Sequence, residues 1–134
     1  MRRAQLQFIP VFLFAIVACA ASRAQQRDAW VALGQRDVND RVDHDVIAVT
    51  ARRGEFHSIK LMVQRAPVDF HRVVVHYGDG SKQEVEMRNT IRAGGESRAI
   101  DLEGRDRVIR SIEFWYDART IRGRKASIRV FGLR

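Results

Sequence analysis

A strict alternation of apolar and polar side chains near the C-terminus constrains this chain more than any other feature. In segment 108–116, Ile112, Phe114 and Tyr116 fall on one side of an extended chain, and segment 125–131 repeats the pattern. A period of two puts successive side chains on opposite faces of a strand, one dry and one wet. With the polar stretch between them, the two segments predict a hairpin that closes a β-structured core.

The same alternation recurs upstream and predicts about eight short strands, spaced roughly ten residues apart. No stretch has the period of an amphipathic helix. We therefore expect an all-β fold, an antiparallel β-sandwich or jelly roll that follows an N-terminal signal segment. Besides the last two, the expected strands cover residues 29–34, 46–50, 57–63, 67–77, 83–87 and 97–102.

The pattern also predicts which side chains face the core. In segment 57–63 the odd-numbered residues, beginning with His57, are expected inside, which leaves Phe56 on the wet face. In the first strand, Trp30 and Leu33 are expected to pack inward. The glycines of segment 78–80 allow the backbone angles of a tight turn, so the strands on either side should form a hairpin.

Residues 1–24 have the organisation of a secretory signal. Arg2 and Arg3 form a charged start, and segment 6–18 is an apolar run. This run is short for a membrane span, which needs about 20 apolar residues. If a general signal peptidase cleaves after Ala24, residues 25–134 remain as a single β-sandwich domain.

An alternative processing site lies just before Cys19. The segment before it resembles a bacterial lipobox, in which the cysteine is acylated and anchors the protein to the membrane. Cys19 is also the only cysteine of the chain. Residues 25–134 therefore contain no disulfide, no cysteine nucleophile and no thiolate metal site.

Positive charge is concentrated toward the C-terminus. The chain has a net charge of +8, and residues 105–134 hold nine basic side chains against three acidic ones. A localised positive region favours anionic partners, which an exported protein meets as lipid headgroups or polysaccharide. The leader argues against nucleic acid as a partner, and contact with a membrane is expected only through a lipid anchor. A merely solubilising surface is the alternative interpretation.

The connection between the last two predicted strands is the strongest candidate for a ligand-binding site. Arginine side chains match the geometry of phosphate and carboxylate groups, and a nearby indole can stack on a sugar. A solvated hairpin end is the alternative. The candidate residues are Arg119, Arg122, Arg124, Lys125 and Trp115.

No metal site or cofactor is predicted. Asp40, Asp43 and Asp45 are weak calcium candidates, because their stretch lacks the glycine-punctuated spacing of a dedicated calcium loop. His71 and His76 lie an odd number of residues apart in one expected strand. They should therefore face opposite sides and cannot share an ion without a bulge.

No catalytic residues are predicted either. None of the serines lies in a Gly-x-Ser-x-Gly elbow, and no glycine-rich loop opens a helix to bind phosphate. Glu84 and Glu86 share a strand face, but the wet side of a hairpin explains them. We expect a non-enzymatic protein. A carbohydrate-active hydrolase on a jelly-roll scaffold and a purely structural envelope lipoprotein remain the alternatives.

Three segments resemble a known bacterial family. They are WVALG at 30–34, RAGGESRAIDL at 92–102 and RVIRSIEFWY at 107–116. Together they are similar to the exported proteins grouped as domain of unknown function 2541, the YaaI-like group, over nearly the whole body of the chain. The resemblance implies a small exported β-domain of the cell envelope, and it brings no catalytic residues.

Overall fold

The computed structural model describes residues 30–38, 43–49, 54–118 and 123–134. All of the regular structure in these ranges is strand, which confirms the all-β prediction, and none of the described residues belongs to a helix able to cross a membrane. The nine strands are β1 (Trp30–Asp37), β2 (Asp43–Ala48), β3 (Glu55–Phe56), β4 (Ser58–Gln64), β5 (Val68–Tyr77), β6 (Lys82–Ile91), β7 (Ile100–Asp101), β8 (Arg107–Ala118) and β9 (Ser127–Leu133).

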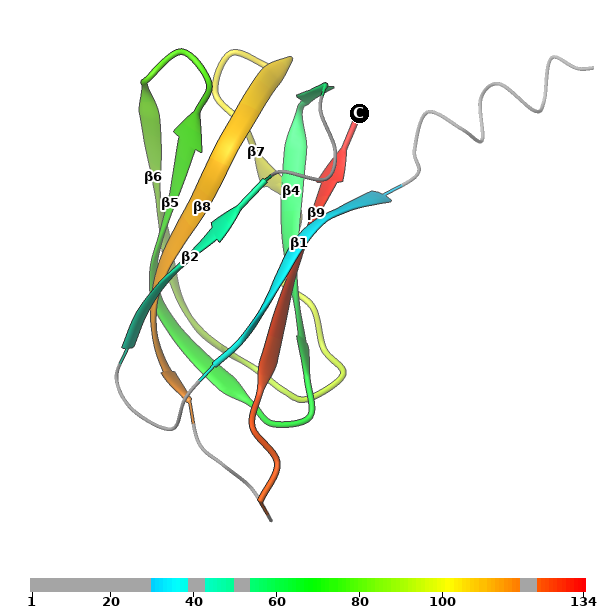
Figure 1. The fold of residues 1–134 in the computed structure, drawn as a ribbon, viewed down its shortest axis with the longest axis vertical. Coiled ribbons are helices and arrows are strands. Elements are labelled where there is room, and N and C mark those ends of the chain that lie inside the picture. The colour runs from blue at the N-terminus through cyan, green and yellow to red at the C-terminus, as the bar shows by residue number, and fades with distance from the viewer. Residues whose placement is uncertain (1–29, 39–42, 50–53, 119–122) are drawn as a thin grey trace, which may run out of the picture.

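The strands form two antiparallel sheets that pack face to face as a sandwich (Figure 1). One sheet has the order β1-β9-β4-β7, and the other has the order β2-β8-β5-β6, with β3 paired to the start of β8. This arrangement confirms the predicted β-sandwich.

The last two strands do not form the predicted hairpin. β8 pairs with β2 and β5 in one sheet, whereas β9 pairs with β1 and β4 in the other. The prediction was wrong because alternation shows which side chains of a strand face the core and does not show which strand lies beside it. β8 and β9 therefore meet across the core and not edge to edge.

The hairpin between β5 and β6 is as predicted. Val73 is the register partner of Val85, and Val75 is the partner of Gln83. At the turn, Gly80 has a φ of +88°, a conformation that glycine adopts without steric cost. The Tyr77 backbone N–H donates to the carbonyl of Ser81 at 2.9 Å.

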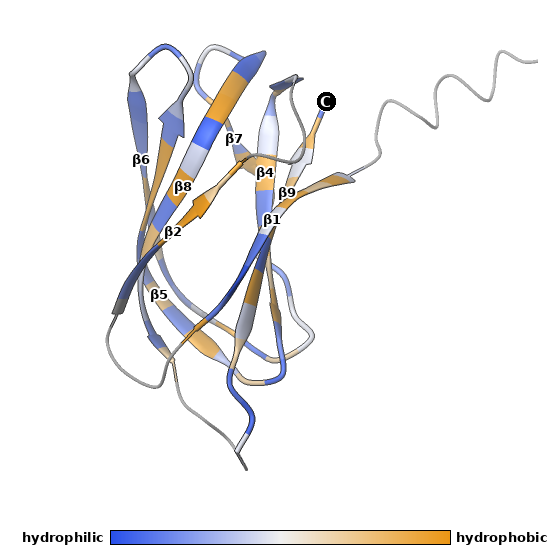
Figure 2. Cartoon of the chain, in the orientation of Figure 1, coloured by the Kyte–Doolittle hydropathy of each residue, from blue (hydrophilic) through white to orange (hydrophobic). Residues whose placement is uncertain are grey.

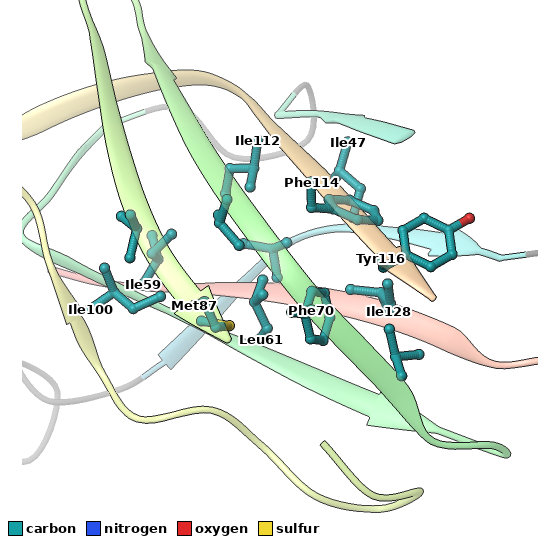
Figure 3. Packing of buried hydrophobic residues seen from close by; sticks show 14 of the residues in the cluster. Ile47, Ile59, Leu61, Phe70, Met87, Ile100, Ile112, Phe114, Tyr116 and Ile128 are labelled. Carbon is teal, nitrogen blue, oxygen red and sulfur yellow. The ribbon is translucent and has the colours of Figure 1, made fainter. Parts of the chain in front are cut away.

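The core between the sheets consists of the apolar sides of the alternating strands (Figures 2 and 3). Ile112 and Phe114 of β8 and Ile128 of β9 have no exposed surface. The ring of Phe70 approaches that of Phe114 edge-on, with centroids 6.2 Å apart. The alternation thus correctly predicted the buried apolar side chains of both C-terminal segments. Ser127, which was expected on the wet side, is 1% exposed, and its hydroxyl accepts a hydrogen bond from the Gln35 side chain at 2.9 Å.

The alternation fails at Phe56, which was expected on the wet face and is 1% exposed. The chain changes sheets here, because β3 pairs with β8 and β4 pairs with β9. His57 lies at the change and is only half-buried. Phe56 fits against Gly132 of β9, where an added Cβ would lie 2.6 Å from the ring atom Cδ1.

The first strand also departs from its prediction. Leu33 is buried as expected, but Trp30 is half-buried on the outer face of its sheet. Trp30 and Leu33 are three positions apart, and an odd separation places two side chains on opposite faces of a strand, so they do not share a face. On the outer face, the Lys60 ammonium lies 4.6 Å from the centre of the Trp30 indole.

Candidate functional site

The pairing of β5 with both of its neighbours is interrupted at one level of the sheet. Phe70 and Arg72 pair with the consecutive residues Tyr116 and Trp115 of β8, which leaves His71 as an extra residue. On the other side, the same two residues of β5 pair with Asn89 and Glu86 of β6, so β6 is irregular at this level as well. Bulges of this kind redirect side chains and are common at functional sites.

A depression opens in the sheet at these bulges. Its volume is about 310 Å³. Arg88 is exposed there and forms no ion pair with any other described residue. The residues that line this bulge depression are Asp69, Phe70, His71, Arg88, Asn89 and Thr90.

The bulge changes the relation between His71 and His76. The two histidines were expected on opposite faces of the strand. Instead, both lie on the outer face and contact carboxylates of β8. His71 Nε2 is 2.8 Å from Asp117 Oδ2, and His76 Nε2 is 2.9 Å from Glu113 Oε1. The prediction was wrong because the extra residue reverses the alternation between the two histidines.

Glu113 is also contacted by a third histidine, His44 of β2, through its other carboxylate oxygen. Hydrogen bonding to His76, and secondarily to His44, lowers the pKa of Glu113. This carboxylate therefore joins β2, β8 and β5 across the outer face.

Trp115 lies between its two register partners. The His44 ring stacks on it with centroids 4.6 Å apart, and the Arg72 guanidinium lies 4.6 Å from the ring centre. Arg72 in turn pairs with Glu84 at 2.7 Å. The indole thus lies on the outer face beside the bulge depression, with an imidazole and a guanidinium already packed against it.

The predicted basic residues are only partly described. Arg119 and Arg122 lie outside the described residues, while Arg124 and Lys125 are exposed just before β9. Neither of these two forms an ion pair with another described residue. β8 ends at Ala118, and its register partner Val68 immediately precedes Asp69 of the depression. The described end of β8 therefore lies at the same end of the sheet as the bulge depression, and no described contact joins Arg124 or Lys125 to Trp115.

Of the three calcium candidates, only Asp45 has a described side chain. Asp45 accepts a hydrogen bond from the Tyr116 hydroxyl at 2.9 Å and pairs with Arg36 at 2.9 Å. Asp43 is the first residue of β2, and Asp40 lies outside the described residues, as does Cys19. Among the described residues, no group of three histidine, aspartate or glutamate side chains is arranged to hold a metal ion.

A second polar network lies at the opposite end of the sandwich. The Arg107 guanidinium lies 3.7 Å from the centre of the Tyr77 ring and donates to the Glu103 carbonyl and to Asp79. Burial raises the pKa of Tyr77, and hydrogen bonds from Ser81 lower the pKa of Asp79. Two open depressions of about 540 and 400 Å³ flank this network. The contacts of both terminal nitrogens of Arg107 join the turn at Glu103 to the turn of the β5–β6 hairpin at Asp79 and Ser81.

The sequence did not predict the bulge depression. A signal was present, because Asn89 is polar where continued alternation from Val85 and Met87 would place an apolar residue. The expected strand ended at residue 87, whereas β6 extends to Ile91.

Fold and site together define a small antiparallel β-sandwich with a polar depression in one sheet. The family model described as Domain of unknown function (DUF2541) matches residues 11–132. The chain belongs to this family, which confirms the resemblance inferred from its three segments.

A comparison with curated proteins finds no match. Among solved structures, the chain is similar to one reported as "Structural and functional characterization of Pseudomonas aeruginosa AlgX", with a TM-score of 0.48 and 12% sequence identity. The match covers 78% of this chain and 27% of that chain, so this protein spans about a quarter of its length. At that TM-score the likeness carries no functional argument.

Proposed function

We propose that this protein is an exported, non-enzymatic binding module of the bacterial cell envelope, and that its ligand is an acidic polysaccharide. The observation that carries the proposal is Arg88, an exposed guanidinium without an ion-pair partner among the described residues, in a depression lined by other hydrogen-bonding groups. The signal-like organisation of residues 1–24 supports export.

The groups in the bulge depression suit a sugar. Sugar hydroxyls both donate and accept hydrogen bonds, and the depression offers donors in Arg88, acceptors in Asp69 and both in Asn89. Its volume of about 310 Å³ lies at the small end of the usual range for ligand pockets, which is compatible with one unit of a glycan. The guanidinium matches a sugar carboxylate bidentately, so an acidic unit is favoured over a neutral one.

The predicted basic residues offer further cations to a polymer. Arg124 and Lys125 are exposed cations, and Arg119 and Arg122 precede them in the sequence. A polysaccharide with repeated carboxylates gains from each cation that it reaches, although each exposed pair is worth only about 0.2–1 kcal/mol. Binding of this kind weakens as salt is added.

Binding of polygalacturonate to the protein, purified as its host processes it, tests the proposal. Fully methyl-esterified polygalacturonate has the same backbone without the charge and should bind more weakly. Arg88→Gln should weaken binding of the acidic polymer about tenfold, as expected for loss of a charge-assisted contact. Lys82→Gln removes one positive charge from the other end of the same strand and should have little effect.

Two results would contradict this function. If Arg88→Gln and Lys82→Gln weaken binding equally, the depression is not the site and only net charge matters. If phosphatidylglycerol vesicles bind and polygalacturonate does not at low salt, the ligand is a lipid headgroup.

Mass spectrometry of the mature N-terminus tests how the protein is processed. An N-terminal acylated Cys19 would show an anchored lipoprotein. An N-terminal Gln25 would show that the leader is removed and that no lipid anchor remains.

One observation favours a glycoside hydrolase as a second candidate. Asp69 and Asp117 are direct register partners on β5 and β8, so their Cβ atoms are expected about 4.5–5.5 Å apart. Retaining glycosidases hold two carboxyl groups roughly 5–5.5 Å apart. An assay for new reducing ends during incubation with polygalacturonate separates the two functions. Release of reducing ends that Asp69→Asn abolishes would replace the binding proposal with the hydrolase.

A further inference from the structure

We infer that His71 makes the bulge depression a proton-gated site, so that it binds an acidic saccharide more tightly in mildly acidic solution than at neutral pH. The inference rests on the proposed function and concerns the regulation of the same site. It starts from the position of the three outer-face histidines, of which only His71 lines the depression.

The charges around His71 set the direction of the effect. Asp117 contacts the imidazole at 2.8 Å, and its register partner Asp69 accepts a hydrogen bond from the Thr90 hydroxyl. Asp69 and the cation Arg88 line the depression, and Asp117 lies beside it through its contact with His71. With a neutral imidazole, these two carboxylates and one guanidinium leave a local charge of −1, which opposes an anionic ligand.

The other charged groups near this level of the sheet lie outside the lining of the depression. Glu86 of β6, the register partner of Arg72, is an exposed carboxylate without an ion pair to another described residue, so it adds to the negative charge around the site. Arg72, the next residue of β5, pairs with Glu84 of β6 at 2.7 Å. On β8, Glu113 is contacted by His44 of β2 and His76 of β5. His71 is therefore the group through which a proton changes the charge inside the depression.

A proton on His71 would remove this net negative charge. Imidazole is the side chain that gains its charge between about pH 8 and pH 5. One added positive charge brings the local total from −1 to 0 and places a second donor cation beside Arg88. For a partly solvated ligand a few ångströms away, the added charge should strengthen binding roughly three- to tenfold.

The test measures the affinity for polygalacturonate at pH 7.5 and pH 5.5 at constant ionic strength, with the protein purified as its host processes it. Carboxylates of this kind have a pKa of about 3.5, so the probe stays ionised at both values. The natural protein should bind about three- to tenfold more tightly at pH 5.5. His71→Gln should bind with the same affinity at both, while His76→Gln, a matched outer-face histidine outside the depression, should keep the pH dependence.

Asp117→Asn provides an opposite test, because it raises the local charge by one and keeps a hydrogen-bonding side chain against the imidazole. Binding at pH 7.5 should strengthen about threefold, which loss of folding cannot imitate. The gate is refuted if the natural protein binds equally at both pH values, if His71→Gln keeps the full pH dependence, or if Asp117→Asn weakens binding. Absence of binding at both pH values refutes the proposed function and the gate together.

Discussion

Replacing Gly132 with alanine tests how closely the two sheets fit where the chain passes from β3 to β4. Gly132 faces the core from β9, and an added Cβ would lie 2.6 Å from Phe56 Cδ1 and 3.0 Å from Leu33 Cδ1. Both neighbours are 1% exposed, so neither side chain has open space into which it can move. The added methyl group should therefore force a shift of the packed core.

Two opposing terms decide the size of the effect. Overpacking a close-packed core costs about 1–3 kcal/mol. Against it, alanine restricts the unfolded chain and stabilises by about 0.4–1 kcal/mol where the backbone accepts it, and Gly132 is not among the glycines with positive φ. The expected result is a protein less stable by about 1–2 kcal/mol, which corresponds to a melting temperature lower by roughly 5–15 °C.

Urea denaturation provides the measurement. The midpoint should fall while the m-value stays unchanged, because the surface exposed on unfolding is the same. Phe56→Leu in the Gly132→Ala background should relieve the clash. The loss of unfolding free energy in the double variant should therefore be smaller than the sum of the two single losses by more than about 0.5 kcal/mol. Additive effects, or an alanine variant as stable as the natural protein, would show that the ring and the strand are not in tight contact.

Two further predictions concern polar groups. Ser97 is buried, and its Oγ accepts a hydrogen bond from the Leu61 backbone N–H at 2.9 Å. Ser97→Ala should lower the free energy of unfolding, measured in urea, by about 1–3 kcal/mol, because a buried amide loses its partner. A change under about 0.5 kcal/mol would contradict this. Glu113 has a lowered pKa in the folded protein, so it contributes stability above the unfolded value of 4.5, and this contribution is lost as the pH falls through the folded value. Glu113→Gln should therefore flatten the fall of melting temperature below about pH 4.5, and an unchanged slope would count against the hydrogen bonds from His76 and His44.

The sequence was most informative about the faces of strands. Ile112, Phe114 and Ile128 are buried as the alternation predicted, because burial on one face is a local property of each strand. Strand partners are a long-range property. Alternation is equally compatible with β8 beside β9 and with β8 facing β9 across the core, which is why the predicted hairpin was wrong.

The site depended on a feature that alternation cannot reveal. A bulge adds one residue relative to the neighbouring strand, so its position is set by the pairing of both strands. His71 and Asn89 consequently lie together in a depression that the sequence analysis did not predict. Arg124 and Lys125 are exposed as the binding prediction requires, while ligand binding itself, the calcium candidates and acylation of Cys19 stay predictions.

The central position of β9 has a consequence for how the sheet assembles. β1 and β4 are joined only through β9, which follows both of them along the chain, so this sheet is incomplete until residues 127–133 have paired. Pairing between strands so far apart in the sequence is slow to form. Until it forms, β1 and β4 keep unpaired backbone edges, which are the parts of a sheet that most readily pair with another chain.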